Sequence, residues 1–455
     1  MADEFRPGAL RPRASHGHEL VPGHGKAPFS RGHSCPKLGR VTNPASAGGS
    51  QHEAIESSVV FLVGAVQFVN ILDFMMVGPL GPFMATALHY SQSHSGWVTG
   101  SYTAAASVSG LVGAFFLDRF DRKRALLVSL VGLSLGTLSG AFAVDLTTLL
   151  VARVVAGAFG GPATSVALSL VADVVPPERR GNAMGKIMGA FAAASVLGVP
   201  FGLELSRMIS WRAPFAFTAL LGAIVGAAVI AKLPVLARPL SPIQGKPRSM
   251  WHDIRRLWRR DILLSYGMTV VAMGASFVLV PNISAYTLKN LAFPENRLGL
   301  LYMAGGVVSF GTSRAVGPLV DKLGAARVGT VGTLVLSAIV VVGFAVSPPL
   351  VPVPAIFVGF MLAMSIRNLS YNTLTTKVPE PKERAAFMSV QSSIQHLASA
   401  AGAIGSSFLL RERADGSLDG MAKVALLSIT VGLCLPPMLF VVEGGIRARA
   451  KSPRA

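Results

Sequence analysis

The sequence predicts an all-α membrane protein with twelve transmembrane helices in two six-helix bundles. Hydrophobic residues make up 51% of the 455 residues, charged residues only 14%, and the mean hydropathy is +0.54. An ordinary soluble protein carries about 25% charged residues, so a soluble fold is excluded. Several apolar stretches also exceed about 18 residues, which is long enough to cross a bilayer at about 1.5 Å per residue.

Short motifs repeat between the two halves of the chain. The segment 117–124 (LDRFDRKR) has a counterpart at 320–327 (VDKLGAAR), and 177–184 (PERRGNAM) has one at 381–388 (PKERAAFM). A duplicated set of membrane spans is a frequent build for a secondary transporter. The repeat therefore predicts two related bundles of six spans each.

The twelve spans are predicted from their apolar runs, in order along the chain. They lie near 59–83, 95–116, 124–144, 149–173, 184–205 and 212–232, and near 262–284, 297–320, 327–346, 353–376, 384–409 and 422–442. The first six spans are separated from the last six by the longest connection between any two neighbouring spans. This connection divides the membrane part into its two bundles.

The spans define five segments. Residues 1–57, rich in Gly, Pro, Arg and His, are expected to form a disordered basic extension. The two bundles are expected at 58–232 and 262–442. Between them, 233–261 is predicted to be a cytoplasmic linker, and its basic stretch fits a helix on the lipid surface or a solvated segment equally well. Residues 443–455 are predicted to be a cytoplasmic tail.

Lysine and arginine are distributed unevenly between the two sides that alternate loops define. The side with the 117–124 loop, the central connection and the C-terminal tail holds roughly 24 of them, and the other side holds 5. Positive loops stay in the cytoplasm, so both termini are predicted to be inside. The expected location is the cell inner (plasma) membrane, where the multipass chain contacts the lipid bilayer.

Several other classes of function are disfavoured. The net charge of +19 is typical of a nucleic-acid binder, but the charges cluster between apolar spans, so no nucleic-acid partner is expected. Cys35 and Cys434 lie far apart, the early histidines lack a ligand spacing, and the sequence has no GKS or GKT loop. We therefore expect no metal, no cofactor, no ATP-driven step and no enzyme activity.

The repeated loops carry charges that suit a gate. The candidate gating residues are Asp118, Arg119, Arg122, Lys123, Asp321 and Lys322. Asp118 is expected at the cytoplasmic end of span two, near basic residues and the start of a neighbouring helix. A carboxylate there can lock two helices in one state and release them in another. The alternative is that the loop only fixes the orientation of the chain in the membrane, a role that needs only the basic residues.

These loops and spans resemble the major facilitator superfamily over about 58–442. The loop pattern of that family between spans two and three is roughly G-x-x-x-D-[RK]-x-G-[RK]-[RK]. The second copy matches it at Gly317, Asp321, Lys322 and Gly324. The first copy has Ala114 and Asp121 where the family prefers glycine. The resemblance implies two bundles that rock about a site near the bilayer midplane.

Span one carries a carboxylate near the bilayer midplane. Asp73 follows Leu72 and precedes Pro82, an arrangement that resembles the drug-efflux branches of the superfamily. A lone charge there costs several kcal/mol unless it is paired or neutralised, so Asp73 is a candidate proton site. Gln67 and Asn70 share its strip of the helix and are expected to line a polar cavity. The alternative is a structural acid bonded to a neighbouring helix.

Arg153, followed by Gly157 and Gly160, resembles the fourth-helix arginine motif of the superfamily. A buried guanidinium needs a partner, so we hypothesise that protonation of Asp73 changes how strongly Arg153 is held. The alternatives are a static pair and an arginine that extends to the outer surface. Glu204, near the outer end of span five, is a second candidate proton site or an interfacial acid.

The candidate substrate cavity combines polar residues of both halves. Its members are Gln67, Asn70, Arg367, Asn368, Tyr371, Asn372, Gln395 and His396. Polar groups within spans face the bundle interior, where they can bind substrate. No carboxylate in the C-terminal spans matches Asp73, so proton handling is expected to rest with the N-terminal bundle.

The leading hypothesis is a secondary active transporter that exports small drug- or sugar-like molecules in exchange for protons. This is what the twelve-helix, arabinose-efflux-like branch of the superfamily implies. In span five, Gly198, Pro200 and Gly202 match the antiporter pattern only in part. The alternatives are a proton-coupled uptake symporter for a metabolite and a non-transporting scaffold or sensor. The protein is expected to be a monomer with protons and a small-molecule substrate as partners.

Overall fold

The computed structural model describes residues 44–116, 120–176, 179–233, 259–346, 351–380 and 383–451. The chain divides into two units, Met1–Ser50 and Gln51–Ala455. The membrane-length helices lie in the second unit. The predicted linker falls mostly outside the described residues, as do residues 1–43 of the predicted extension.

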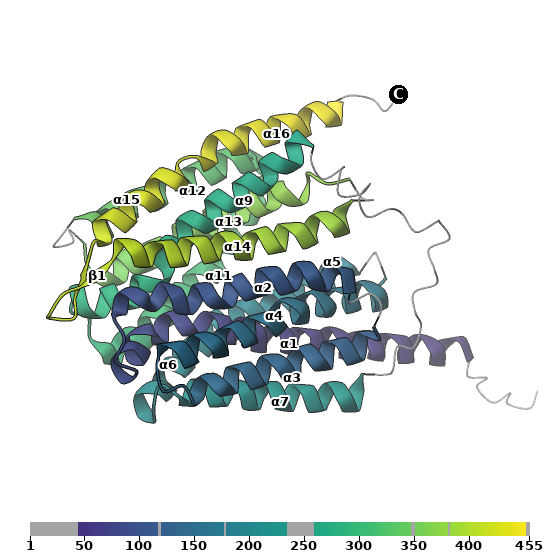
Figure 1. The fold of residues 1–455 in the computed structure, drawn as a ribbon. Helices are drawn as coiled ribbons and strands as arrows, with labels where there is room; N and C mark the ends of the chain where they lie inside the picture. The colour runs from purple at the N-terminus through teal and green to yellow at the C-terminus, as the bar shows by residue number, and fades with distance from the viewer. Residues whose placement is uncertain are drawn as a thin grey trace, which may run out of the picture. The chain divides into compact units, whose positions relative to one another are not determined.

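Six long helical runs form the N-terminal half (Figure 1). They are α1 (Pro44–Ala87), α2 (Ser95–Phe116), α3 (Arg122–Ala141), α4 (Leu146–Val174), α5 (Arg180–Ala193) with the π-helix η3 (Ala194–Gly198) and α6 (Val199–Met208), and α7 (Ala213–Lys232). A short 3-10 helix, η1 (Gln92–His94), precedes α2. The irregular turn in the fifth run ends at Gly198, two residues before Pro200, and proline has no N–H to continue the helical ladder.

The C-terminal half has the same order of long runs. They are α9 (Arg260–Leu279) continued by η4 (Val280–Asn282), α10 (Ile283–Ala285) and η5 (Tyr286–Asn290), then η6 (Glu295–Arg297) with α11 (Leu298–Leu323), α12 (Ala325–Val340) with η7 (Val341–Ala345), α13 (Val353–Thr376), α14 (Arg384–Leu409), and α15 (Met421–Gly432) with α16 (Leu435–Lys451). These runs coincide with the predicted spans to within a few residues at most ends. The prediction of an all-α membrane protein is confirmed.

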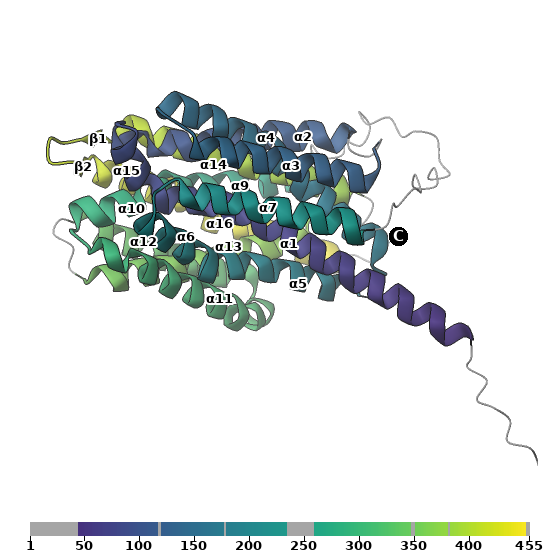
Figure 2. The same cartoon turned by 90° about the horizontal axis from the view of Figure 1, so that it is seen from below.

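Nine of the helical runs in the described ranges are long and apolar enough to cross a membrane. The other three long helices, α2, α11 and α14, each contain several glycines and serines. They pack against other helices at the contact between the two halves: α2 lies along α14, and α11 lies against η3 and α6 as well as α13 (Figure 2). Small residues suit such contacts because they let helix backbones approach closely.

Helix α1 starts earlier than predicted. It begins at Pro44, so residues 44–57, which we expected to be disordered, are helical. Proline is favoured at the first position of a helix, and the alanines, Gln51 and Glu53 that follow favour continuation. The disorder prediction for this part of the extension is therefore wrong.

Aspartates start two of the N-terminal helices. The Asp121 carboxylate accepts from the backbone N–H of Arg124 at the start of α3, and Asp145 accepts from that of Thr148 at the start of α4. Such caps satisfy amides that have no partner within the helix. The hydrogen bonds from the Thr148 amide and hydroxyl also lower the pKa of Asp145.

A β-hairpin marks one end of the membrane part. Strands β1 (Arg411–Glu412) and β2 (Leu418–Asp419) pair antiparallel between α14 and α15. We call this the hairpin end, and the opposite end, where α3, α5 and α9 begin, the basic end (Figure 1). Arg122, Arg179 and Arg259 lie at these three helix starts. The Gln92 backbone N–H donates to Glu412 over 2.7 Å. The hairpin end therefore carries a direct contact between the two halves.

The contact between the halves follows an approximate two-fold relation. Gly96 lies against the Ala403 carbonyl, and Gly299 lies against the Pro200 carbonyl. Residue numbers 96 and 299 differ by 203, as do 200 and 403. The loop residues Asp118 and Asp321 have the same separation. The sequence repeat therefore has a counterpart in three dimensions, in which each half uses corresponding positions to contact the other.

The glycine at 157 allows α2 and α4 to pack closely. A Cβ at Gly157 would lie 2.2 Å from the Tyr102 carbonyl oxygen, whereas one at Gly64 in α1 would meet nothing within 4 Å. Gly157→Val should therefore force α2 away from α4.

We expect Gly157→Val to lower the thermal unfolding midpoint of the purified protein in detergent, as overpacking costs about 1–3 kcal/mol. Gly64→Val makes the same change of residue in a membrane helix and serves as the control. Equal midpoints for the two variants would show that the α2–α4 contact is loose.

Candidate functional site

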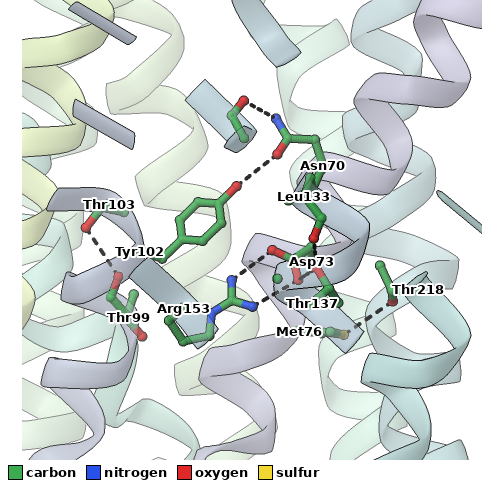
Figure 3. Close-up of polar contacts among 12 residues, drawn as sticks. Asn70, Asp73, Met76, Thr99, Tyr102, Thr103, Leu133, Thr137, Arg153 and Thr218 are labelled. Carbon is green, nitrogen blue, oxygen red and sulfur yellow. Dashed lines mark hydrogen bonds and ion pairs between the residues drawn. The ribbon is translucent and has the colours of Figure 1, made fainter. Parts of the chain in front are cut away.

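A buried ion pair joins the first and fourth spans. Helix α1 places Asp73 and helix α4 places Arg153 with 0% and 1% of their surfaces exposed. Arg153 donates from Nη1 to Oδ1 over 2.9 Å and from Nη2 to Oδ2 over 2.8 Å (Figure 3). Two parallel hydrogen bonds between guanidinium and carboxylate form the strongest and most directional type of ion pair. The structure thus brings together the two residues that the sequence analysis paired.

Helices α2 and α3 complete the surroundings of the pair. The Thr137 hydroxyl lies 2.7 Å from Oδ1 of Asp73 and 2.9 Å from the Leu133 carbonyl. The Arg153 guanidinium stacks over the Tyr102 ring, 4.7 Å from its centroid. An aromatic face attracts a cation without taking a hydrogen bond. Asp73 and Arg153 are therefore held by groups from all of the first four spans.

Asn70 extends this network to two further residues of α4. It accepts from the Tyr102 hydroxyl over 2.8 Å and donates to Thr164 Oγ1 over 2.7 Å and to the Gly160 carbonyl over 3.2 Å. A Cβ at Gly160 would lie 2.3 Å from the Tyr102 hydroxyl oxygen. The glycines of the fourth-helix motif thus make room for Tyr102, on whose ring Arg153 of the same helix stacks.

Gln67, one turn before Asn70, is also buried. Its Oε1 has no hydrogen-bond partner among the described residues. The predicted strip of Gln67, Asn70 and Asp73 therefore faces the protein interior, and Gln67 keeps a free acceptor there.

Glu204 lies apart from this network. It pairs with Arg207 one turn later in α6, 3.0 Å from Arg207 Nε, and both side chains are 47% exposed. An exposed pair of this kind contributes little to stability. Of the two interpretations of Glu204, an acid at the membrane interface fits this exposure better than a proton site sealed from water.

A second buried arginine lies in the C-terminal half. Arg367 of α13 donates to the Ala272 carbonyl over 3.1 Å and contacts the Ser276 hydroxyl, both in α9, and Asn368 Oδ1. Tyr371 is buried close by. Ser276 lies 203 residues after Asp73, the separation that relates the two halves. In each half, therefore, a buried arginine contacts the residue at this position of the repeat. The position holds a carboxylate in one half and a hydroxyl in the other.

Of the remaining cavity candidates, only Asn368 contacts Arg367 in the described part of the chain. Asn372 and Gln395 are exposed, and Asn368 and His396 are half-buried. The Gln391 amide instead contacts the Thr269 hydroxyl inside the C-terminal half. The structure thus supports Gln67, Asn70, Arg367 and Tyr371 as interior groups.

The gating candidates are only partly described. Asp118 and Arg119 lie outside the described residues. Arg122 pairs with Asp173 over 3.4 Å, and Lys123 Nζ lies 2.9 Å from the Ile230 carbonyl. Asp321 and Lys322, at the end of α11, are exposed.

The first turn of α12 has a partner that sequence analysis missed. Glu443 of α16 accepts from the Ala326 backbone N–H over 2.6 Å. Gly324, which adopts φ +92°, makes the turn before α12. A carboxylate from the last span thus caps α12, which no loop motif indicates.

Tyr102, Thr137 and Thr164 were also missed. Each is an uncharged polar residue within a span, and such residues are common in membrane helices that pack together. Tyr102 could have been identified by matching a large side chain in α2 to the small residues 157 and 160 in α4. That match requires knowing that α2 packs on α4.

The comparisons with known proteins agree with this fold. The family model of the Major Facilitator Superfamily matches residues 63–403. The purine ribonucleoside efflux pump NepI of Escherichia coli is 28% identical over 354 residues, covering 76% of this chain and 85% of the pump. The uncharacterized MFS-type transporter YfhI of Bacillus subtilis is 24% identical over 221 residues, which is 48% of this chain and 54% of that protein.

Solved structures show the same fold. A bacterial homologue of the human lysosomal transporter Spinster, in an inward-facing, unoccupied conformation, superimposes with a TM-score of 0.69 at 16% identity. The match covers 88% of this chain and 99% of that chain.

The fold and the buried polar network define a multipass membrane transporter rather than an enzyme. The chain belongs to the Major Facilitator Superfamily. The resemblance that the loop motifs indicated is therefore confirmed. A small-molecule substrate and a membrane setting follow from membership of this family.

The ion pair generates a stability prediction. Asp73→Asn should leave Arg153 as an uncompensated buried charge, and breaking such a pair costs about 3–5 kcal/mol. Asp73→Asn and Arg153→Met should therefore each lower the thermal midpoint, whereas the double variant should recover much of the loss. Additive losses in this double-mutant cycle would show that the pair is not energetically coupled.

Proposed function

We propose that this transporter exports small uncharged molecules in exchange for protons, and that purine ribonucleosides are the first substrate class to test. The observation that carries the proposal is the sealed carboxylate–guanidinium pair of Asp73 and Arg153 within the membrane helices. The similarity to a purine ribonucleoside efflux pump over most of both chains supports the direction and the substrate class.

Proton exchange at Asp73 acts on the link between α1 and α4. While the carboxylate is ionised, it neutralises Arg153 and holds the two helices together. When the carboxyl takes a proton, the guanidinium loses its counter-charge in a medium where a lone charge is costly. Asp73 is sealed in this conformation, so a proton reaches it only after the helices around it move.

An aromatic row leads from the pair to the other half. The ring of Tyr102, under Arg153, lies 5.5 Å from that of Phe74, and Phe74 lies 6.0 Å from Phe277 in α9. Phe74 and Phe277 occupy corresponding repeat positions, 203 residues apart. A shift of Arg153 therefore moves side chains at the contact between the two halves. Alternating access requires movement at this contact.

The basic loops support an orientation. The basic end carries Arg122, Arg179 and Arg259, so we place it in the cytoplasm, with both termini, and the hairpin end outside. Among the described residues, Arg122 pairs with Asp173 and Arg259 with Glu380, and each of these two pairs joins residues of one half. These pairs support movement of each half as one bundle, 58–232 against 262–442.

The further parts of the proposal follow from the sequence. We assign the gate at the basic end to the repeated loops, with Asp118, Arg119 and their counterparts Asp321 and Lys322. The protein acts as a monomer in the inner membrane, without a nucleic-acid partner. Gln67, Asn70 and Arg367 supply interior polar groups for the substrate.

Transport in proteoliposomes tests the proposal. With an imposed proton gradient and an internal pH dye, wild type should move inosine against the proton flux, and Asp73→Asn should lose the coupled movement by at least tenfold. Glu204→Gln serves as the matched control, because its carboxylate is exposed and lies outside the buried network.

Three outcomes contradict parts of the proposal. Coupled movement that survives in Asp73→Asn would move the proton site elsewhere. Inosine and protons moving in the same direction would make the protein an uptake symporter. No movement of inosine, lipophilic cations or small sugars in either direction would favour a scaffold or a carrier for a narrower metabolite.

A further inference from the structure

A pocket at the hairpin end is built by both halves. It has a volume of about 470 Å³ and lies between the end of α1, the segment that joins α6 to α7, and the turns η5 and η6. This volume lies in the range of sites that hold small organic ligands. The buried pair of Asp73 and Arg153 does not line it.

Two buried polar atoms in this pocket have no partner. Trp211 Nε1 and Ser206 Oγ form no hydrogen bond with the described residues, although their side chains are only 6% and 7% exposed. The indole N–H can only donate. A buried donor left unsatisfied costs about 1–3 kcal/mol, so a ligand that brings an acceptor to either atom removes that cost.

The rest of the lining is aromatic and charged. Phe83 and Phe293 contribute ring surface from the two halves, and Lys289 and Glu295 add an ammonium and a carboxylate. Aromatic walls suit a planar ring, an indole donor suits a ring nitrogen or carbonyl, and a carboxylate accepts from hydroxyl groups. This combination matches a planar heteroaromatic ring that bears a hydroxylated substituent.

We propose that this pocket is a second binding site for nucleoside-type molecules, separate from the buried network. The substrate class rests on the proposed function, whereas the site rests on the pocket itself. Because its walls come from both halves, a bound molecule stabilises the arrangement in which the two halves meet at the hairpin end. Nucleoside added on the hairpin side should therefore inhibit export.

Binding can be measured without transport. A variant with Trp97→Phe, Trp251→Phe and Trp258→Phe retains Trp211 as its one tryptophan. Inosine added to this protein in detergent should quench or shift the emission of Trp211 in a saturable way, and ribose or tetraphenylphosphonium should not. No saturable change with inosine or hypoxanthine would overturn the proposal.

Inhibition gives a second, independent measurement. In proteoliposomes with otherwise wild-type protein, external inosine should inhibit export, and Trp211→Phe or Ser206→Ala should raise the inhibitory concentration about three- to tenfold, as expected for one lost hydrogen bond. Trp97→Phe is the matched control: Trp97 packs on Phe408 and does not line the pocket. Unchanged inhibition in both pocket variants would exclude the site.

The two proposals fail separately. Saturable Trp211 quenching by inosine without nucleoside transport would support the pocket and contradict the substrate class of the transporter. Nucleoside export that depends on Asp73, without quenching or inhibition, would contradict the pocket alone.

Discussion

The neutralisation of Arg153 by Asp73 is the interaction on which the N-terminal half depends. A guanidinium within membrane helices is costly unless a counter-charge or hydrogen-bond acceptors hold it closely, and the bidentate geometry requires α1 and α4 to keep one register. That register in turn requires Gly157 and Gly160, because Tyr102 fills the space beside them. The polar network is thus a packing constraint as well as a chemical site.

The two halves share a framework but differ in chemistry. Corresponding glycines, Gly96 and Gly299, contact corresponding carbonyls across the halves. At the first-helix position that faces an arginine, however, one half has Asp73 and the other has Ser276. The two halves thus share their packing, but only the N-terminal half places a carboxylate at this position. The C-terminal half is left with Arg367, which meets only neutral acceptors in the described part of the chain.

The spans could be predicted from sequence because their apolar runs are long enough to cross a bilayer. Asp73 and Arg153 could be predicted as site residues because charges within such runs are rare. Tyr102, Thr137 and Glu443 could not, since their contacts depend on how each helix is rotated about its axis, which hydropathy does not record. The start of α1 was misjudged because a composition rich in Gly and His hid a helix that Pro44 begins. The Trp211 pocket combines three segments, 82–87, 206–211 and 288–295, so it has no local sequence pattern.

Under the proposed proton exchange, the presence of one carboxylate among the two buried arginine sites has an electrical consequence. In a one-for-one exchange of a proton for an uncharged molecule, each cycle moves a single elementary charge across the membrane. The membrane voltage then contributes about 2.3 kcal/mol per 100 mV to the driving force, in addition to the pH difference. A cell that keeps its interior negative would therefore continue to drive export when the pH on the two sides is equal.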